Sequence, residues 1–472
     1  MLPETFDVSR RDFLKRTVLT TAAGWSLLIP EAVQSAEAAG GSLRIAPFKF
    51  DVTPPIGHGC CGGWIKPIEV VDDSLEAVGI VLLGAGKPIV LCAVDWTGLL
   101  NEAHVQWRTA LATAAGTTPD RVAVHCVHQH NAPMACLEAE RIVAAEGDLP
   151  HLLMVDFFNR CLKAGRVAIE TAIPKARPVT HVGTGQGKVI GVASNRRVKR
   201  DHNGKVLAMR GSACTDETLI AMDEGLIDPF CKTVAFFDGD KKVASLHYYA
   251  VHPMSYYADG RCTSDFAGLA RKQRQQDEPD CLHVYFTGCA GNVAAGKYND
   301  GSKGARPILT KRLYDGIVAS EANLNRVELK PDSVAWKTAE ILPPPRSSLN
   351  AETIAEQISN KSNSVVARNR PSYMLSWLRR IEKRIPIVLS SLHLGGVKLL
   401  HLPAESFIEY QLRAQRSQPD QFVCTAAYGD GGPWYIPVKE EYPNGGYEVS
   451  VAFCEPEIDD VLTAGMQQIL SQ

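Results

Sequence analysis

The apolar positions in the first third of the chain fall into short runs that are separated by glycine, proline and charged turns. Two strand-like runs, SLRIAPFKFDVTPPIG and AVGIVLLGAGKPIVLCAVDW, precede a helix-like stretch from Ala103 to Ala114, and the run RVAVHCVH follows it. The order strand, helix, strand predicts a βαβ unit.

Similar patterns continue through the middle of the chain. A helical pattern covers about Leu152 to Thr171, and KTVAFFDGDKKVASLHYYAVHP predicts a hairpin that turns at Asp238-Gly239-Asp240. CLHVYFTGCAGN is a further strand that runs into a Gly-rich turn, and the stretch from Arg306 to Asn323 predicts a helix. In IPIVLSSLHLGGVKLLHLPAESF, two more strands flank a turn at Gly395-Gly396.

A run of three prolines, Pro343 to Pro345, interrupts this pattern. Two polar helical stretches follow it, at about Ala351–Val366 and Ser372–Arg384, before the strands resume. We therefore predict the fold class α/β, with mixed sheets and flanking helices in one large domain, residues 41–472, that carries a helical insertion at residues 349–384.

The first 38 residues have the three-part pattern of an export signal. Paired arginines at positions 10 and 11 precede Phe13-Leu14-Lys15 and a modest apolar stretch, which ends in the A-x-A pattern Ala36-Glu37-Ala38. The segment resembles a twin-arginine signal peptide, and an amphipathic N-terminal helix is the alternative. We expect residues 1–38 to be removed and the mature protein to be periplasmic or secreted. No later segment is long and apolar enough for a transmembrane anchor.

The net charge and the spacing of the cysteines exclude one class of partner and one kind of metal site. The formal net charge is −2, so no basic surface field points to nucleic acid, and we expect no nucleic-acid partner. The expectation of a small-molecule or lipid substrate, and of transient contact with a membrane surface, follows only from the family resemblance that the motifs below carry. None of the 13 cysteines forms a C-x-x-C pair, so the spacing of a zinc ribbon is absent from the sequence.

The segment AVHCVHQHNAPM, residues 123–134, concentrates three histidines in an apolar run. The alternation of a strand places His128 and His130 on the same face. Two such imidazoles can reach one ion, or one can bind metal while its neighbour faces the substrate, and a purely structural pair is the alternative. Zinc accepts neutral imidazole nitrogen and usually has three or four protein ligands, so a metal site requires further ligands.

Two predicted strand ends offer such ligands. HYYAVHPMS places His252 directly before a proline that cannot continue the strand, and LLHLPAESFIEY places Glu405 just after another. Because α/β sheets usually bind ligands where strands meet loops, we expect these side chains near the site. Together with His128 they make a three-ligand hydrolase set with an open position for water, whereas singly each would be a solvated loop residue.

Two other segments leave alternatives open. In YGDGGPWYIPVKEEYPNGGYEV, the phenol of Tyr435 can serve a metal or an oxyanion, or the segment is a glycine-rich surface loop with packed aromatics. In GVASNRRVKR, Asn195 and Arg197 can reach the pocket to hold an anionic or polyhydroxyl group, or they belong to a solvated basic run.

Four of these segments, in this order, resemble the N-terminal catalytic domain of the neutral/alkaline ceramidase family. VHQHNAP is similar to the family's His-Thr-His-Ser-Gly-Pro segment and YYAVHPMS to its Ala-Val-His strand end. LPAESF is similar to its Pro-Gly-Glu turn, and YIPVKEEY to Tyr-Ile-Thr-Thr-x-Glu-Glu-Tyr. DVTPPIG, residues 51–57, resembles the family's opening strand and turn, so the resemblance extends over most of the mature chain.

The resemblance implies a zinc-dependent hydrolase that cleaves a linear amide (N-acyl) bond, as in sphingolipid metabolism, by metal-activated water. It implies a Zn²⁺ cofactor with four ligands, His128, His252, Glu405 and Tyr435. His130 would then face the substrate as a general acid/base, with Tyr435 as an oxyanion donor. TSDFAG resembles the family's Asp-x-x-Gly, so Asp265 would orient a metal-binding side chain without itself contacting the metal.

The sequence departs from the family at one catalytic segment. The family's Gly-Asp-x-Ser-Pro-Asn corresponds here to TGCAGNVAAG, with Ala290 or Gly291 in place of the serine. Cys289 is adjacent, and a cysteine hydrolase built on this thiol is one alternative function. The others are a zinc hydrolase of a non-lipid amide or ester, and a non-catalytic exported binding protein with a vestigial metal site.

Overall fold

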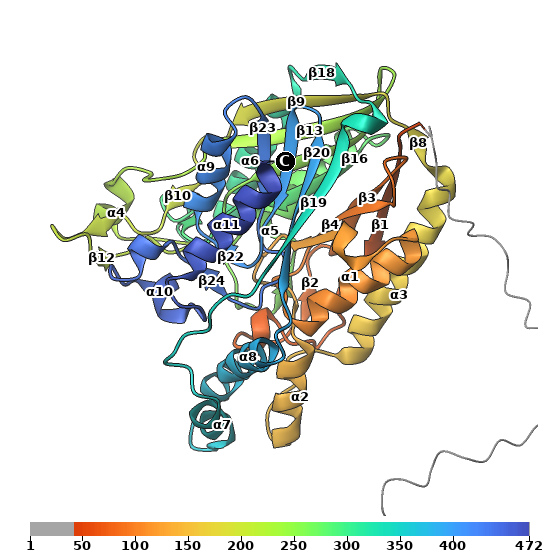
Figure 1. The fold of residues 1–472 in the computed structure, drawn as a ribbon. Coiled ribbons are helices and arrows are strands. Elements are labelled where there is room, and N and C mark those ends of the chain that lie inside the picture. Colours follow the sequence, from red (N-terminus) through yellow and green to blue (C-terminus); the bar gives the residue numbers. More distant parts are fainter. Residues whose placement is uncertain (1–41, 472) are drawn as a thin grey trace, which may run out of the picture. The chain divides into compact units, whose positions relative to one another are not determined.

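The predicted βαβ unit forms one side of the first sheet (Figure 1). The computed structural model describes residues 42–471. Its first sheet contains, in spatial order, the strands β6 (Val122–Cys126), β4 (Ile89–Val94), β3 (Glu76–Leu83), β1 (Arg44–Asp51) and β8 (Arg177–Pro178). Strands β4 and β6 pair in parallel, with α1 (Glu102–Ala115) between them along the chain. Every residue of these two strands is buried, as is usual for parallel strands covered on both faces.

The predicted central hairpin lies in the second sheet. This sheet contains the strands β16 (Leu282–Thr287), β14 (Lys241–Tyr249), β13 (Phe230–Asp238), β9 (His181–Lys188) and β18 (Asn325–Glu328). Strands β13 and β14 are antiparallel, and Gly239 at their turn has a φ of +57°, a left-handed conformation that glycine adopts without strain. The hairpin and its turn are confirmed.

The second predicted hairpin lies in a third sheet of β19 (Val334–Ile341), β20 (Ile387–Leu394), β21 (Val397–His401) and β23 (Phe422–Ala426). Its turn at Gly395 is also left-handed, with a φ of +61°. Strands β21 and β23 run parallel. Short strands form five further pairs: β2 (Val70–Val71) with β15 (Arg261–Cys262), β5 (Gly98–Leu99) with β7 (Met134–Ala135), β10 (Ser194–Asn195) with β17 (Val293–Ala294), β11 (Lys199–Arg200) with β12 (Val206–Ala208), and β22 (Glu405–Ser406) with β24 (Tyr435–Ile436).

Helices flank the sheets, which confirms the α/β fold class. Besides α1, the α-helices are α2 (Leu137–Glu146), α3 (Val155–Ala172), α4 (Glu217–Ala221), α5 (Asp265–Asp277), α6 (Ala305–Glu321), α7 (Ala351–Ser359), α8 (Val365–Glu382), α9 (Ile408–Ser417), α10 (Tyr447–Val451) and α11 (Ile458–Leu470). Helices α1 and α3 lie side by side against the first sheet, α6 packs on β9 and β13, and α11 packs on β19 and β20 (Figure 1). The described residues form one compact unit.

The two helices predicted between residues 349 and 384 are present as α7 and α8, with different boundaries. The break between them falls near Asn360 rather than before Ser372. The side chain of Asn360 accepts a hydrogen bond from the backbone N–H of Ser362 in the connecting turn, and Ser364 caps the start of α8. Pro371, which falls between the two predicted stretches, lies inside α8. These helices contact α2 (Figure 1).

The predicted export signal, residues 1–38, lies outside the described residues. In the part of the chain that the structure describes, none of the helices combines the length and the apolar character that a membrane span requires.

A buried ion pair joins α8 to the loop after β23. Arg380 Nη1 lies 2.5 Å from Asp430 Oδ2, and Asp430 Oδ1 accepts the backbone N–H of Asn101 at 2.9 Å. Both charged side chains are buried. Although burial alone would raise the pKa of Asp430, the Arg380 guanidinium and the other donors lower it, so this carboxylate stays ionised.

We expect Asp430→Ala to lower the free energy of unfolding by about 3–5 kcal/mol, because it leaves the Arg380 charge buried without a partner. Urea denaturation of the purified variant measures this change. Arg379→Ala on the same helix is the control, because Arg379 and Glu138 form an ion pair that is open to solvent, and its loss should cost at most about 1 kcal/mol. Equal losses in the two variants would contradict the expectation.

Candidate metal centre

The histidine segment does not form the strand that the alternation predicts. Strand β6 ends at Cys126, so His128 and His130 lie in the loop that follows. The prediction of a shared strand face is therefore wrong, yet the two rings still meet, with their centroids 5.0 Å apart. The physical reason is the backbone of His128, whose φ of +77° is left-handed and turns the chain sharply at this residue.

The ring of His128 is held with one nitrogen directed to Glu405. His128 Nδ1 lies 2.6 Å from the backbone oxygen of Thr97, so Nδ1 carries the proton and donates. In the neutral ring Nε2 is then an acceptor, and it faces Glu405 Oε2 at 3.3 Å. Both atoms are buried without a hydrogen-bond partner among the described residues. Two acceptors at this distance repel each other unless a cation or an extra proton lies between them.

His252 completes the cluster from the second sheet. It follows the end of β14 by three residues, and its Nε2 lies 3.3 Å from His130 Nε2 while its Nδ1 lies 3.8 Å from Glu405 Oε2. Burial and the neighbouring imidazoles lower the pKa of His252 well below its usual value, so its ring is neutral. The ligand atoms of His128, His130 and His252 lie within 4.8 Å of one another, which suits a single ion.

A small cavity lies beside this cluster. Its volume is about 20 Å³, and His128, Glu405, Tyr428 and Trp434 border it, whereas His130, His252 and Tyr435 do not. That volume holds one water-sized particle.

Tyr428 is a member of the cluster that the sequence reasoning missed. Its ring stacks on that of His128 at 4.2 Å, and its hydroxyl lies 3.4 Å from His252 Nδ1. The available signal was its place at the end of an apolar strand, directly before the glycine-rich segment. Burial raises the pKa of Tyr428, so its phenol stays protonated and orients the two rings.

Tyr435 stands beside Glu405 because β22 and β24 pair in parallel with these two residues in register. Its hydroxyl accepts a hydrogen bond from Arg196 Nη1 at 3.2 Å. Burial raises the pKa of Tyr435, so its phenol keeps a proton that it can donate. Although burial disfavours the Arg196 charge, the neighbouring Tyr435, Glu448 and Glu405 raise the pKa of Arg196. Of the three consecutive residues Asn195, Arg196 and Arg197, Arg196 therefore belongs to the cluster.

Asn195 and Arg197 lie elsewhere. The amide of Asn195 donates to the backbone oxygen of Leu226, and its oxygen accepts from the backbone N–H of Arg197. The Arg197 guanidinium is buried against Glu448 at 2.9 Å and Glu441 at 2.7 Å. These contacts hold residues 441–448 in place, and the structure does not bring the two side chains to the histidines. Arg197 is also not part of a solvated run.

Asp265 and Cys289 also contact other groups. Asp265 accepts the backbone N–H of Ser255 at 3.0 Å, three residues after His252, so it supports the loop rather than a ring of the cluster. Cys289 is fully buried, and burial raises the pKa of its thiol far above the usual range. A thiol that stays protonated is a poor nucleophile, which argues against the cysteine-hydrolase alternative.

Left-handed backbone conformations gather around the cluster. Besides His128, Ala404 has a φ of +52°, Tyr428 of +59° and Trp434 of +65°. Ala404 and Trp434 directly precede Glu405 and Tyr435. A non-glycine residue in this region costs about 1–3 kcal/mol, and such strain concentrates at functional sites. Strained backbone conformations therefore position the side chains of His128, Glu405, Tyr428 and Tyr435.

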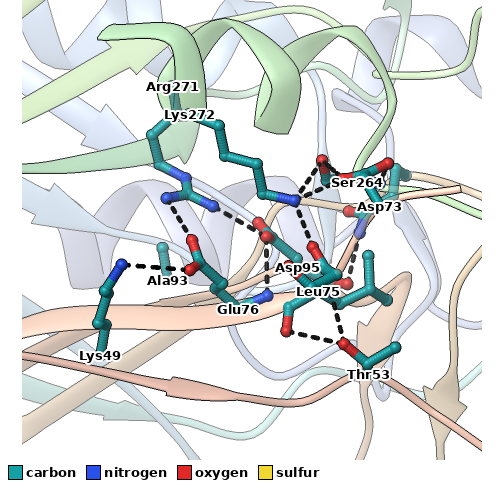
Figure 2. Close-up of polar contacts among 12 residues, drawn as sticks. Lys49, Thr53, Asp73, Leu75, Glu76, Ala93, Asp95, Ser264, Arg271 and Lys272 are labelled. Carbon is teal, nitrogen blue, oxygen red and sulfur yellow. Dashed lines mark hydrogen bonds and ion pairs between the residues drawn. The ribbon is translucent and has the colours of Figure 1, made fainter. Parts of the chain in front are cut away.

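A network of ion pairs joins α5 to the first sheet (Figure 2). Arg271 of α5 donates to Glu76 and to Asp95, each at 3.0 Å, at the ends of β3 and β4. The backbone oxygen of Asp95 in turn accepts a hydrogen bond from the side chain of Gln129, which stands between the two loop histidines. The network thus fixes the loop on the first sheet.

A second group of potential ligands, His247, His283 and Glu321, lies away from the cavity. His247 contacts His283 through one ring nitrogen and Thr233 through the other, at 2.9 and 2.8 Å. The Glu321 carboxylate is paired with the cations of Lys242 and Arg274. Because both ring nitrogens of His247 and the Glu321 carboxylate already have partners, we assign this group as a hydrogen-bonded core network and not as a further candidate metal site.

Comparison with known proteins gives a fold relationship. The chain matches no protein-family model and no curated protein sequence. It is similar to the neutral ceramidase from Pseudomonas aeruginosa with a TM-score of 0.65 and 16% sequence identity, over 91% of this chain and 73% of that chain. A structure described as ceramidase complexed with C2 matches with a TM-score of 0.66 and 15% identity, over 91% and 75%. At these identities the likeness shows the fold alone.

Proposed function

We propose that the protein is an exported zinc-dependent hydrolase that cleaves an amide (N-acyl) bond. One observation carries this proposal: His128 Nε2 and Glu405 Oε2, both buried acceptors without a donor among the described residues, face each other at 3.3 Å. The fold that the chain shares with ceramidases and the four sequence segments support it.

The ligands proposed for zinc are His128, His252 and Glu405, and the phenol of Tyr435 serves either as a further ligand or as an oxyanion donor. Neutral imidazole nitrogen and carboxylate oxygen are usual zinc ligands, and catalytic sites keep a position open. When bound, zinc would supply a Lewis acid for the scissile carbonyl and a water of lowered pKa.

The proton-transfer role falls to His130. It is the more exposed of the two loop histidines, so it is the one that can face a substrate. Burial and the charges of His128 and Arg196 lower the pKa of His130 well below its usual value, so the ring is neutral at physiological pH. Its Nδ1 is buried and has no hydrogen-bond partner among the described residues, so this nitrogen would act as a general acid/base only for a substrate group that lies directly against the ring.

Tyr435 and Arg196 are placed to stabilise developing negative charge. The Tyr435 hydroxyl accepts from Arg196 and keeps its own proton, so it can donate toward an oxyanion beside Glu405. Donors that are already in position cost little reorganisation when charge develops, which is why such groups accelerate acyl transfer.

No serine can take part at the position where the ceramidase family has one. A Cβ atom on Gly291 would lie 2.3 Å from the backbone oxygen of Glu405, so a side chain is excluded there. Ala290 is fully buried. The proposal is therefore direct hydrolysis by water, and it extends to non-lipid amides and esters, which a panel of N-acyl and O-acyl substrates would separate.

Elemental analysis of the mature protein, purified without a histidine tag, tests the proposal. We expect about one zinc per chain. Treatment with 1,10-phenanthroline should abolish hydrolysis of the acyl panel, and added zinc should restore it. Folded protein that has been offered zinc and binds none would contradict the proposal and would leave the binding-protein alternative. Activity that survives removal of zinc would contradict the metal-dependent mechanism.

A further inference from the structure

One arginine of α8 differs from the others on the same helix. The other three arginines each have a carboxylate partner: Arg368 with Asp148 at 2.9 Å, Arg379 with Glu138 at 3.4 Å, and Arg380 with Asp430 at 2.5 Å. Arg370 has no carboxylate oxygen within 4.0 Å among residues 42–471. Its charge is therefore uncompensated by a direct ion pair, although the side chain is only partly exposed.

Aromatic side chains fix the position of Arg370. Its guanidinium lies over the ring of Trp64, 5.4 Å from the centroid, and Nη2 lies 3.5 Å from the hydroxyl of Tyr447. A guanidinium that stacks on a ring loses little freedom when it binds a further group, and its fork matches the two oxygens of a carboxylate. Arg370 is thus prepared for an anion that the protein itself does not supply.

The same tyrosine links Arg370 to the metal centre. The Tyr447 ring lies 5.8 Å from that of Tyr435 and 5.5 Å from the guanidinium of Arg196. Arg196 is itself engaged with the Tyr435 hydroxyl and lies 3.4 Å from Glu448. Of the two arginines beside Tyr447, only Arg370 therefore lacks a carboxylate partner among the described residues.

The surroundings are accessible. Tyr447 and Tyr257 are each 42% exposed, and the Tyr257 ring lies 5.7 Å from that of His130. These residues, with Trp64 and Arg370, form an aromatic rim beside the only loop histidine of the centre that is not buried. A substrate bound at His130 would therefore lie beside Tyr257 of this rim.

We propose that Arg370 selects the substrate by binding a carboxylate that the scissile amide compound carries. This inference rests on the proposed hydrolase function and narrows it to anionic amides, such as N-acyl amino acids. An uncharged amide gains nothing from Arg370, whereas a carboxylate forms paired hydrogen bonds with its fork. The helical insertion would thus supply the specificity of the site.

Calorimetry with the zinc-loaded protein tests this. The probes are N-hexanoyl derivatives of glycine, 4-aminobutanoate and 6-aminohexanoate, each beside its neutral methylamide, so that the distance from amide to carboxylate varies. We expect at least one acid to bind about 10- to 100-fold more tightly than its methylamide, and Arg370→Gln to remove that preference. Arg370→Lys should retain part of it. Arg379→Gln, which removes a charge from the same helix, is the control and should retain all of it.

Several outcomes overturn the inference. They are equal binding of every acid and its methylamide by the wild-type protein, absence of binding of every acid, and a preference that survives in Arg370→Gln. The zinc content of each variant shows whether its metal centre remains intact. A carboxylate preference without hydrolysis of any probe would contradict the proposed hydrolase function and leave the anion site standing. Hydrolysis of the probes without a carboxylate preference would overturn the anion site and leave the proposed hydrolase function standing.

Discussion

Replacing His252 by alanine is expected to remove both the bound zinc and the hydrolase activity. His252 is the proposed ligand that follows β14 of the second sheet, and its Nδ1 and Nε2 face Glu405 and His130 at 3.8 and 3.3 Å. Loss of even an outer partner of a metal ligand typically costs 10–100-fold in affinity or activity, so loss of the ligand should cost more than about 100-fold. Elemental analysis and hydrolysis of the acyl panel measure the two effects.

Two variants make this result specific. His247→Ala removes a buried histidine of β14 that lies five residues before His252 in the sequence and belongs to the separate hydrogen-bonded group with His283 and Glu321. We expect this control to keep its zinc. His252→Gln keeps polarity at the site and guards against a folding defect in the alanine variant. Full zinc content in folded His252→Ala would show that His252 is not a ligand.

Glu405→Gln is expected to abolish activity while leaving the fold intact or stabilising it. The substitution removes the only carboxylate of the ligand set, so zinc affinity should fall by at least about 100-fold. In the metal-free protein, however, the new amide N–H group can donate to His128 Nε2, which now faces a carboxylate oxygen at 3.3 Å. Relief of that contact should raise the free energy of unfolding by about 1 kcal/mol.

Urea denaturation after chelation, together with zinc analysis, checks both parts. Glu409→Gln is the matched control. Glu409 is also a carboxyl whose pKa burial raises, but it accepts a hydrogen bond from the Asn292 side chain and is not in the proposed ligand set. It should keep zinc and activity. If Glu405→Gln destabilised the metal-free protein by about 3–5 kcal/mol, an imidazolium–carboxylate ion pair would be present instead of a metal site.

The sequence predicts the features that depend on local patterns. The βαβ unit, both hairpins and the long helices follow from periodicity and from glycine at turns, and the structure contains them. His252 and Glu405 are recognisable as candidates because a proline near each one ends the strand. Strand ends of different sheets then meet, which places these two residues beside His128.

Other features of the centre depend on contacts that no local pattern contains. Alternation cannot predict the left-handed turn at His128, because the conformation is imposed by the surrounding packing and by the bond to Thr97. The sequence also does not show which arginine of the adjacent pair reaches the cluster. Arg196 contacts Tyr435, whereas Arg197 forms an ion pair with Glu448. Tyr428 becomes a partner of His128 only once the third sheet is in place.

The three sheets that meet at the cluster also determine when the centre can exist. His128 follows β6 of the first sheet, His252 follows β14 of the second, and Glu405 follows β21 of the third. Closing the long loops between them costs chain entropy, so such distant contacts form after the local ones during folding. A cation cannot nucleate this fold, because no single hairpin or helix that forms early contains two of these three residues. The cluster is therefore expected to assemble last, and a metal ion bound there would show that all three sheets have formed.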